Sequence, residues 1–114
     1  MIFFKNTVYE NDNKVIYFEA LDNDKSVGSC TLILSDKFAE VSKLDFDGKS
    51  MFIAEGLLKS AFNYAAFKSY YIAKCNIKAL NALLLGLGFQ LKNSEYISDI
   101  PTILMGSCKH CSEQ

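Results

Sequence analysis

Residues 50–68, SMFIAEGLLKSAFNYAAFK, decide the fold class because their apolar side chains recur every three or four positions. This spacing places the apolar side chains on one face of a helix, and an amphipathic helix of this kind packs on a sheet. The residues of this face are Met51, Ala54, Leu57, Leu58, Ala61, Phe62, Ala65 and Ala66. We therefore expect one long helix that covers a sheet built from the rest of the chain.

The chain before this helix contains four short runs of β-forming residues, separated by polar turn signals. These runs predict strands over residues 8–9, 15–20, 27–34 and 38–46. Residues 10–13 are expected to join the first two strands as a hairpin. Consecutive strands with short connections favour an antiparallel meander.

The chain after the helix predicts a strand over residues 70–73, a second helix over 77–87, and strands over 89–91 and 96–100. The second helix ends at Gly86 and Gly88, where a helix takes a left-handed cap. Pro101 has no amide hydrogen to donate, so it stops the last strand, and a short helical turn over 102–106 follows it.

The expected order of elements is therefore β-β-β-β-α-β-α-β-β, an α/β (α+β) fold with a mixed sheet. A crossover from strand through helix to strand is right-handed and makes parallel neighbours of the two strands that it joins. The fourth and fifth strands are thus expected to form a parallel pair inside an otherwise antiparallel sheet.

Length and composition favour one domain over residues 1–106 with a short tail over 107–114. With 114 residues, half of them apolar, the chain has material for one hydrophobic core. The twelve basic residues are all lysines and are interspersed with thirteen acidic residues, which argues against nucleic acid as a partner. There is neither a membrane-spanning apolar run nor a signal-peptide core, so we expect a cytoplasmic protein with reduced cysteines.

Two stretches of the chain resemble the GNAT superfamily of N-acetyltransferases, and small divergent clostridial-type members in particular. Residues 54–65, AEGLLKSAFNYA, are similar to the cofactor-side helix of that fold. Residues 81–89, NALLLGLGF, are similar to its second helix and to the Gly-Phe pair that leads into the sixth strand. The resemblance covers nearly the whole chain. It implies transfer of an acetyl group from acetyl-CoA to an amine.

The resemblance also implies where the cofactor binds. In the family, acetyl-CoA lies in a V-shaped gap between the fourth and fifth strands, and amides at the start of the following helix hold its diphosphate. The residues that match this site are Lys49, Ser50, Met51, Phe52, Ile53 and Ala54, together with Asn76 at the end of the fifth strand.

This loop departs from the family pattern, because Phe52 stands where the family has a glycine, and its ring would crowd the diphosphate. A shifted register would instead use Gly48 in a nest of amides over residues 47–50. A third interpretation needs no cofactor. In it, Ser50 caps the helix, and Met51 and Phe52 belong to the core.

The catalytic residues remain unassigned at this stage. Many family members have a Tyr four residues before the Gly of Gly-Phe, where its hydroxyl protonates the departing thiolate. Here that position is Leu84, and Glu40 and Asp45 on the fourth strand are candidate general bases. Two hypotheses follow. The first is a GNAT-like acetyltransferase acting on a small-molecule amine or a protein N-terminus, and the second is a catalytically degenerate GNAT-fold module for binding or homodimerisation.

The tail carries the residues of a C-x-x-C motif with one histidine, namely Cys108, His110 and Cys111. A structural zinc site usually needs four ligands, so a second tail in a dimer, or Cys30 or Cys75, would have to complete the set. We interpret the motif as free thiols and expect no metal. Cys75 is interpreted as a buried structural cysteine, because nothing in the sequence activates its thiol.

Overall fold

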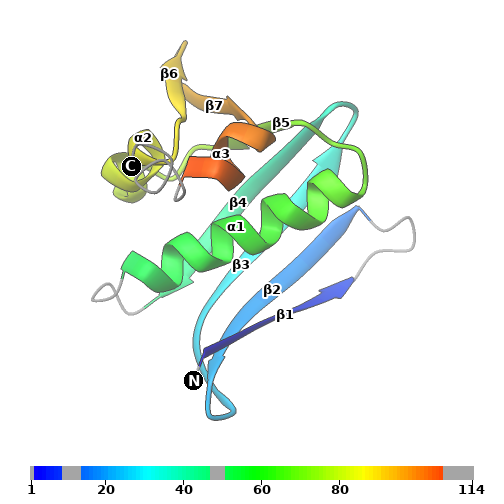
Figure 1. Ribbon diagram of the computed structural model, residues 1–114, viewed down its shortest axis with the longest axis vertical. Helices are drawn as coiled ribbons and strands as arrows, with labels where there is room; N and C mark the ends of the chain where they lie inside the picture. The colour runs from blue at the N-terminus through cyan, green and yellow to red at the C-terminus, as the bar shows by residue number, and fades with distance from the viewer. Residues whose placement is uncertain (1, 9–13, 47–50, 107–114) are drawn as a thin grey trace.

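The computed structural model describes residues 2–8, 14–46 and 51–106, which form a seven-stranded mixed sheet with its helices packed on one face (Figure 1). The strands are β1 (Ile2–Val8), β2 (Val15–Asp22), β3 (Lys25–Ser35), β4 (Phe38–Phe46), β5 (Ile72–Cys75), β6 (Gln90–Lys92) and β7 (Glu95–Asp99). Their order across the sheet is β1-β2-β3-β4-β5-β7-β6. The predicted mixed fold and its order of elements are confirmed.

The long helix α1 (Met51–Phe67) runs across the sheet and joins β4 to β5, which pair in parallel as expected. The second predicted helix is shorter than expected and begins with a tight turn. Its first part is the 3₁₀ helix η1 (Lys78–Leu80), and α2 (Asn81–Gly86) follows directly. Such 3₁₀ turns are frequent at helix N-termini. A last helix, α3 (Ile100–Gly106), follows β7.

The end of α1 explains why β5 begins two residues later than predicted. The amide of Tyr70 donates to the carbonyl of Ala65, and the amide of Ser69 donates to the carbonyl of Ala66. With Ser69 at φ +72°, this is the Schellman arrangement that closes a helix. The cap therefore takes up the residues that the sequence assigned to the strand. At the end of α2 the same arrangement uses Gly88, at φ +103°, which confirms the predicted left-handed cap.

Two hairpins are closed by two-residue turns whose residues both have positive φ. Asn23 and Asp24, at φ 53° and 70°, join β2 to β3. Asn93 and Ser94, at φ 52° and 66°, join β6 to β7. Positive φ at both positions matches the right-handed twist of the flanking strands, and Asn and Asp tolerate it better than most residues do.

The core lies between α1 and one face of the sheet. Alternate residues of β2, β3, β4 and β5 point into this core, and the buried residues of all three α-helices belong to the same cluster. The opposite face of the sheet has no described helix on it, as Figure 1 shows. Its side chains are partly exposed, among them Tyr17, Ile33 and Glu40. The described helices therefore leave one face of the sheet uncovered.

Asp99 starts α3 by accepting hydrogen bonds from Thr102. The Thr102 amide donates to Oδ2 at 3.0 Å, and its hydroxyl lies 2.9 Å from Oδ1 and 2.8 Å from Oδ2. These bonds hold the pKa of Asp99 below its ordinary value because they favour the charged carboxylate. Pro101 lies in the first turn of the helix, where the missing amide hydrogen costs no intrahelical bond.

Candidate functional site

A gap opens between β4 and β5 where their pairing ends. Residues 38–41 of β4 pair with residues 72–75 of β5, where β5 ends, and β4 continues to Phe46. From Ser42 onward, no described strand lies beside the β5-facing edge of β4. The backbone amides and carbonyls that point away from β3 along this edge therefore have no strand partner among the described residues.

A β-bulge at Ser42 lies at the point where the two strands separate. Thr31 pairs with Lys43, whereas Leu32 pairs with Val41, so Ser42 has no partner in the ladder. A bulge bends and twists its strand, which favours the divergence of β4 from β5. The bulge also shifts the alternation of side chains. Lys43 therefore lies on the same face as Glu40, whereas strict alternation in the sequence would place it opposite.

The first turn of α1 begins close after the end of β4. Met51 and Phe52 are 44% and 60% exposed, while Ile53 and Ala54 are buried against the sheet. The interpretation that Met51 and Phe52 belong to the core is therefore wrong. Lys49 and Ser50 lie outside the described residues. The amides of the first helical turn have no intrahelical partners, so this end of α1 attracts anions.

Both candidate bases lie on the open face of the sheet, but only Glu40 lies beside β5. Glu40 is paired in register with Lys74 of β5, whereas Asp45 lies beyond the end of the β4–β5 pairing. The Lys74 ammonium forms an ion pair with Glu95 at 3.5 Å and lies 3.9 Å from the centre of the Phe38 ring. Glu40 is thus left without an ion pair in the described part of the chain, next to the closed end of the gap.

Asn76 directly follows β5, and its side chain faces β7. Its carboxamide oxygen accepts a hydrogen bond of 3.0 Å from the amide of Tyr96. The Tyr96 hydroxyl in turn donates to the carboxamide oxygen of Asn81 at the start of α2. Asn76 follows Cys75 at the closed end of the gap, and its side chain helps line a cavity on the other side of β5. The roles of Tyr96 and Asn81 could not be predicted, because they depend on the pairing of β7 with β5.

Solved structures with the same arrangement of strands and helices are acetyltransferases. The PaiA N-acetyltransferase of Thermoplasma acidophilum, in complex with coenzyme A, has a TM-score of 0.65 at 16% identity, over 74% of this chain and 58% of that one. YhhK of Escherichia coli, bound to coenzyme A, has a TM-score of 0.70 at 9% identity, over 87% of this chain and 98% of that one. The ribosomal-protein-S18-alanine N-acetyltransferase of Escherichia coli has a TM-score of 0.69 at 10% identity, over 86% of this chain and 94% of that one.

The chain has the GNAT fold. It spans less than two thirds of the PaiA structure, but nearly the whole length of the two Escherichia coli proteins. No protein-family model matches the sequence, and the comparison with curated proteins gives no significant match. At these low identities the likeness shows the fold, and the activity has to be argued from the site.

Leu84, which the sequence comparison aligned with a tyrosine of many GNAT enzymes, is buried. Leu84 has no exposed surface and belongs to the same core cluster as Leu80 of η1 and Leu87 and Phe89 after α2. It cannot donate a proton, and no polar side chain of α2 replaces it there. The surroundings of Leu84 are therefore apolar.

The two described cysteines are buried thiols on the core side of the sheet. Burial raises the pKa of Cys30 to about 12, and the nearby Cys75 adds to the rise. Burial also raises the pKa of Cys75 to about 11. A hydrogen bond from the Ile77 amide partly offsets this rise, and the negative charge of Glu40 adds to it. Neither thiol is a nucleophile at neutral pH, because the thiolate is the reactive form.

The sheet order also keeps these two thiols from forming a disulfide. Cys30 is on β3 and Cys75 is on β5, with β4 between them. Two strand spacings amount to roughly 9.6 Å, which exceeds the distance of about 7 Å that a disulfide spans between Cα atoms. Cys75 is therefore a structural cysteine, as its sequence context indicated.

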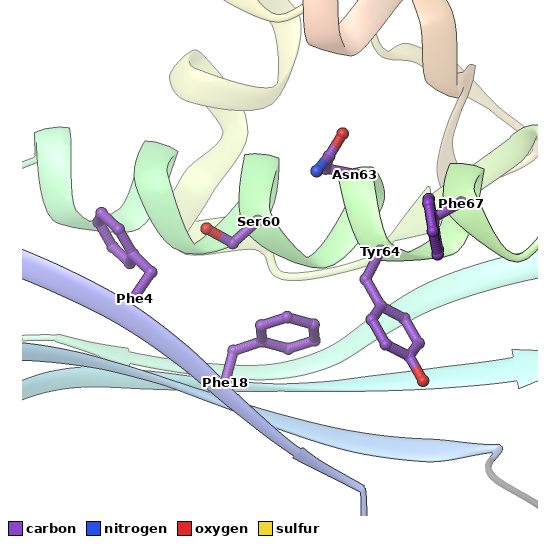
Figure 2. A pocket seen from close by; sticks show the side chains of 6 residues that line it. All are labelled: Phe4, Phe18, Ser60, Asn63, Tyr64 and Phe67. Atoms are coloured by element: carbon purple, nitrogen blue, oxygen red, sulfur yellow. The ribbon is translucent and has the colours of Figure 1, made fainter.

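A separate hollow of about 310 Å³ lies between β1 and α1 (Figure 2). Its lining residues are Phe4, Phe18, Ser60, Asn63, Tyr64 and Phe67. The Phe18 and Tyr64 rings pack edge to face, with 6.0 Å between their centres. Gly56 permits the close approach of Phe4, since a Cβ there would come within 2.2 Å of its ring. β2 and β3 separate this hollow from the gap between β4 and β5.

Among the residues that the structure describes, no group of three or more His, Cys, Asp and Glu could hold a metal ion. Cys108, His110 and Cys111 lie outside these residues, so the interpretation of the tail stays a prediction. No described helix is both long and apolar enough to span a membrane.

Proposed function

We propose that this protein is an N-acyltransferase that transfers an acetyl group from acetyl-CoA to an amine. The observation that carries the proposal is the open edge of β4 beyond Val41, next to the end of β5. The bulge at Ser42 and the start of α1 lie at the two ends of this edge. In two of the solved structures with this fold, coenzyme A is bound.

The cofactor would lie along this edge of β4. The pantetheine arm contains two amide groups, which suit the unpaired amides and carbonyls between Ser42 and Phe46. The diphosphate would lie at the first turn of α1, held by the amides of residues 50–54 and by the charge of Lys49. Asn76 follows Cys75 at the closed end of the gap, and we keep it among the expected cofactor contacts. The thioester would then lie near the closed end, between Val41 and Cys75.

The open face of the sheet gives the amine a route to the thioester. The amine nitrogen attacks the thioester carbon, the C–S bond breaks, and the products are an amide and the CoA thiolate. Glu40 would accept the proton that the amine loses, through a water molecule if needed. The thiolate would take its proton from solvent, since Leu84 cannot supply one. A small-molecule amine and a protein N-terminus both satisfy this chemistry.

A second function is supported by the substitution at Leu84. A chain that binds CoA poorly, or not at all, would serve as a binding module, and its open sheet face would support a homodimer. In either case the buried thiols of Cys30 and Cys75 suit a reducing compartment, and we place the protein in the cytoplasm.

Thermal denaturation in the presence of ligands separates the two functions. A ligand that binds only the folded state raises the melting temperature by an amount that depends on its concentration relative to its Kd. Acetyl-CoA and CoA should give a rise that grows with the logarithm of their concentration above Kd, and ATP should not, because it lacks the pantetheine arm that would pair with β4. A flat response to acetyl-CoA at millimolar concentration would contradict the enzyme and leave the binding module.

A further inference from the structure

A second cavity, of about 360 Å³, lies on the side of β5 that faces away from the gap. It is lined by Asn76, Lys78, Asn81, Leu91, Ser94 and Tyr96. These residues come from the end of β5, from η1 and α2, and from the β6–β7 hairpin, and none comes from β4 or α1. Since the sheet order is β4-β5-β7-β6, the cavity is distinct from the proposed cofactor gap.

The hydrogen bonds of Tyr96 determine what the two asparagines offer to this cavity. The backbone amide of Tyr96 can only donate, so it binds the carboxamide oxygen of Asn76. The Tyr96 hydroxyl donates to the carboxamide oxygen of Asn81. Both oxygens are therefore used, and neither NH₂ group has a partner among the described residues. Each side chain thus has a free NH₂ donor beside an oxygen that already accepts one hydrogen bond.

The charged group in the lining is positive, so it favours the same kind of ligand as these donors. Lys78 is exposed, and no described acid forms an ion pair with it. No carboxylate lines the cavity, and Glu95, which follows Ser94 in the chain, is paired with Lys74. Two carboxamide donors, one ammonium group and the Ser94 hydroxyl therefore surround the same space. Such a set binds an anion with oxygen acceptors.

The remaining walls are apolar, and they limit the kind of anion. Leu91 and the ring of Tyr96 provide these walls, and the volume suits a small molecule. A single lysine balances one negative charge, whereas a phosphate group at neutral pH carries more and is usually met by more cations. We propose that this cavity binds a small carboxylate with a short apolar chain, held by Asn76, Lys78 and Asn81. The proposal does not depend on the acetyltransferase function.

Nuclear magnetic resonance of the ¹⁵N-labelled full-length protein, titrated with butyrate at constant ionic strength, tests this site directly. The side-chain amide signals of Asn76 and Asn81 should shift in a saturable way at millimolar butyrate. Acetate should bind several-fold more weakly, because it lacks the chain that contacts Leu91. Shifts that do not saturate would overturn the site, and inorganic phosphate binding more tightly than butyrate would overturn the assignment to a carboxylate.

A variant of almost the same shape separates the effect of the NH₂ donor on binding from the effect of packing. Asn81→Asp keeps the oxygen that accepts from Tyr96 and replaces the NH₂ donor by a negative oxygen, so butyrate affinity should fall by about tenfold or more. Lys78→Gln, at an exposed position that no fold contact requires, should weaken binding several-fold. Lys37→Gln, at the far end of the sheet, should leave the affinity unchanged. Wild-type affinity in both Asn81→Asp and Lys78→Gln would overturn the proposal.

Discussion

Glu40 and Lys74 are direct neighbours across the parallel pair of β4 and β5, yet they do not form the ion pair that their positions would allow. The Lys74 ammonium instead binds Glu95 and lies over the ring of Phe38. Glu40 therefore keeps an unpaired, partly exposed carboxylate within the described part of the chain, on the open face and at the edge of the gap. For this reason we propose Glu40 as the general base.

Glu40→Gln should lower the rate of acetyl transfer by about 10² or more, because general-base catalysis contributes roughly 10² to 10⁴ in rate. The thermal shift with acetyl-CoA should stay the same, since the side chain is on the open face and not along the edge that would bind the cofactor. The rate is measured as CoA release with the best acceptor from a screen of amines.

Asp45→Asn is the matched control, because Asp45 is on the same face of β4 but beyond the end of β5. It should retain most of the activity. If Asp45→Asn removed the activity and Glu40→Gln did not, the base would be Asp45, and the thioester would have to lie closer to α1.

Gly88→Ala should destabilise the fold by about 1–3 kcal/mol, because its φ of +103° disfavours any residue with a Cβ. The new Cβ would also come within 2.7 Å of Thr102 Cγ2. Gly86→Ala is the control, since a Cβ at this helical position meets nothing within 4 Å and should be neutral or slightly stabilising. Urea denaturation of both variants measures the difference, and equal stabilities would show that the cap at Gly88 is not strained.

Periodicity in the sequence predicted the course of α1 to within one residue at each end. It predicted on which face of the helix each side chain lies, but not whether another element covers that part of the face. Ala54, Leu57 and Leu58 are buried as expected, whereas Met51 is 44% exposed on the same helix face. The start of β5 was missed because Ser69 adopts a left-handed cap without the glycine that usually marks one, and this cap takes up the residues assigned to the strand.

The candidate site was less predictable, because it depends on register. The bulge at Ser42 has no signal in the sequence, yet it changes which residues of β4 share a face. The proximity of Glu40 to Lys74 likewise follows from the parallel pairing of β4 with β5, and their spacing along the chain does not reveal it. The resemblance to the GNAT fold gave the location of the gap, and the structure gave the side chains around it.

The buried thiols should make the protein less stable at alkaline pH. Their ordinary pKa is 9.0, and burial raises it to about 12 for Cys30 and about 11 for Cys75. Above pH 9 the unfolded chain loses these protons while the folded chain keeps them, so stability is full below about pH 9 and is lost as the pH rises toward the raised values.

Cys30→Ala isolates this effect from the titration of the lysines, which both proteins share. The variant should be less stable at every pH because of the lost packing, but its unfolding free energy should fall less steeply above pH 9 than that of the wild type. Parallel curves from urea denaturation would mean that Cys30 titrates normally in the folded state.

Phe52→Ala should increase the affinity for CoA several-fold if the diphosphate lies at the first turn of α1. The Phe52 side chain is 60% exposed at this turn, so its removal clears space without opening the core, and the stability should change by no more than about 0.5 kcal/mol. Phe67→Ala, at the other end of the same helix and 86% exposed, is the matched control and should leave CoA affinity unchanged. Isothermal titration with CoA measures both. An unchanged affinity in Phe52→Ala would mean that the phosphates do not approach this turn, and the shifted loop around Gly48 would then be the better match to the GNAT diphosphate site.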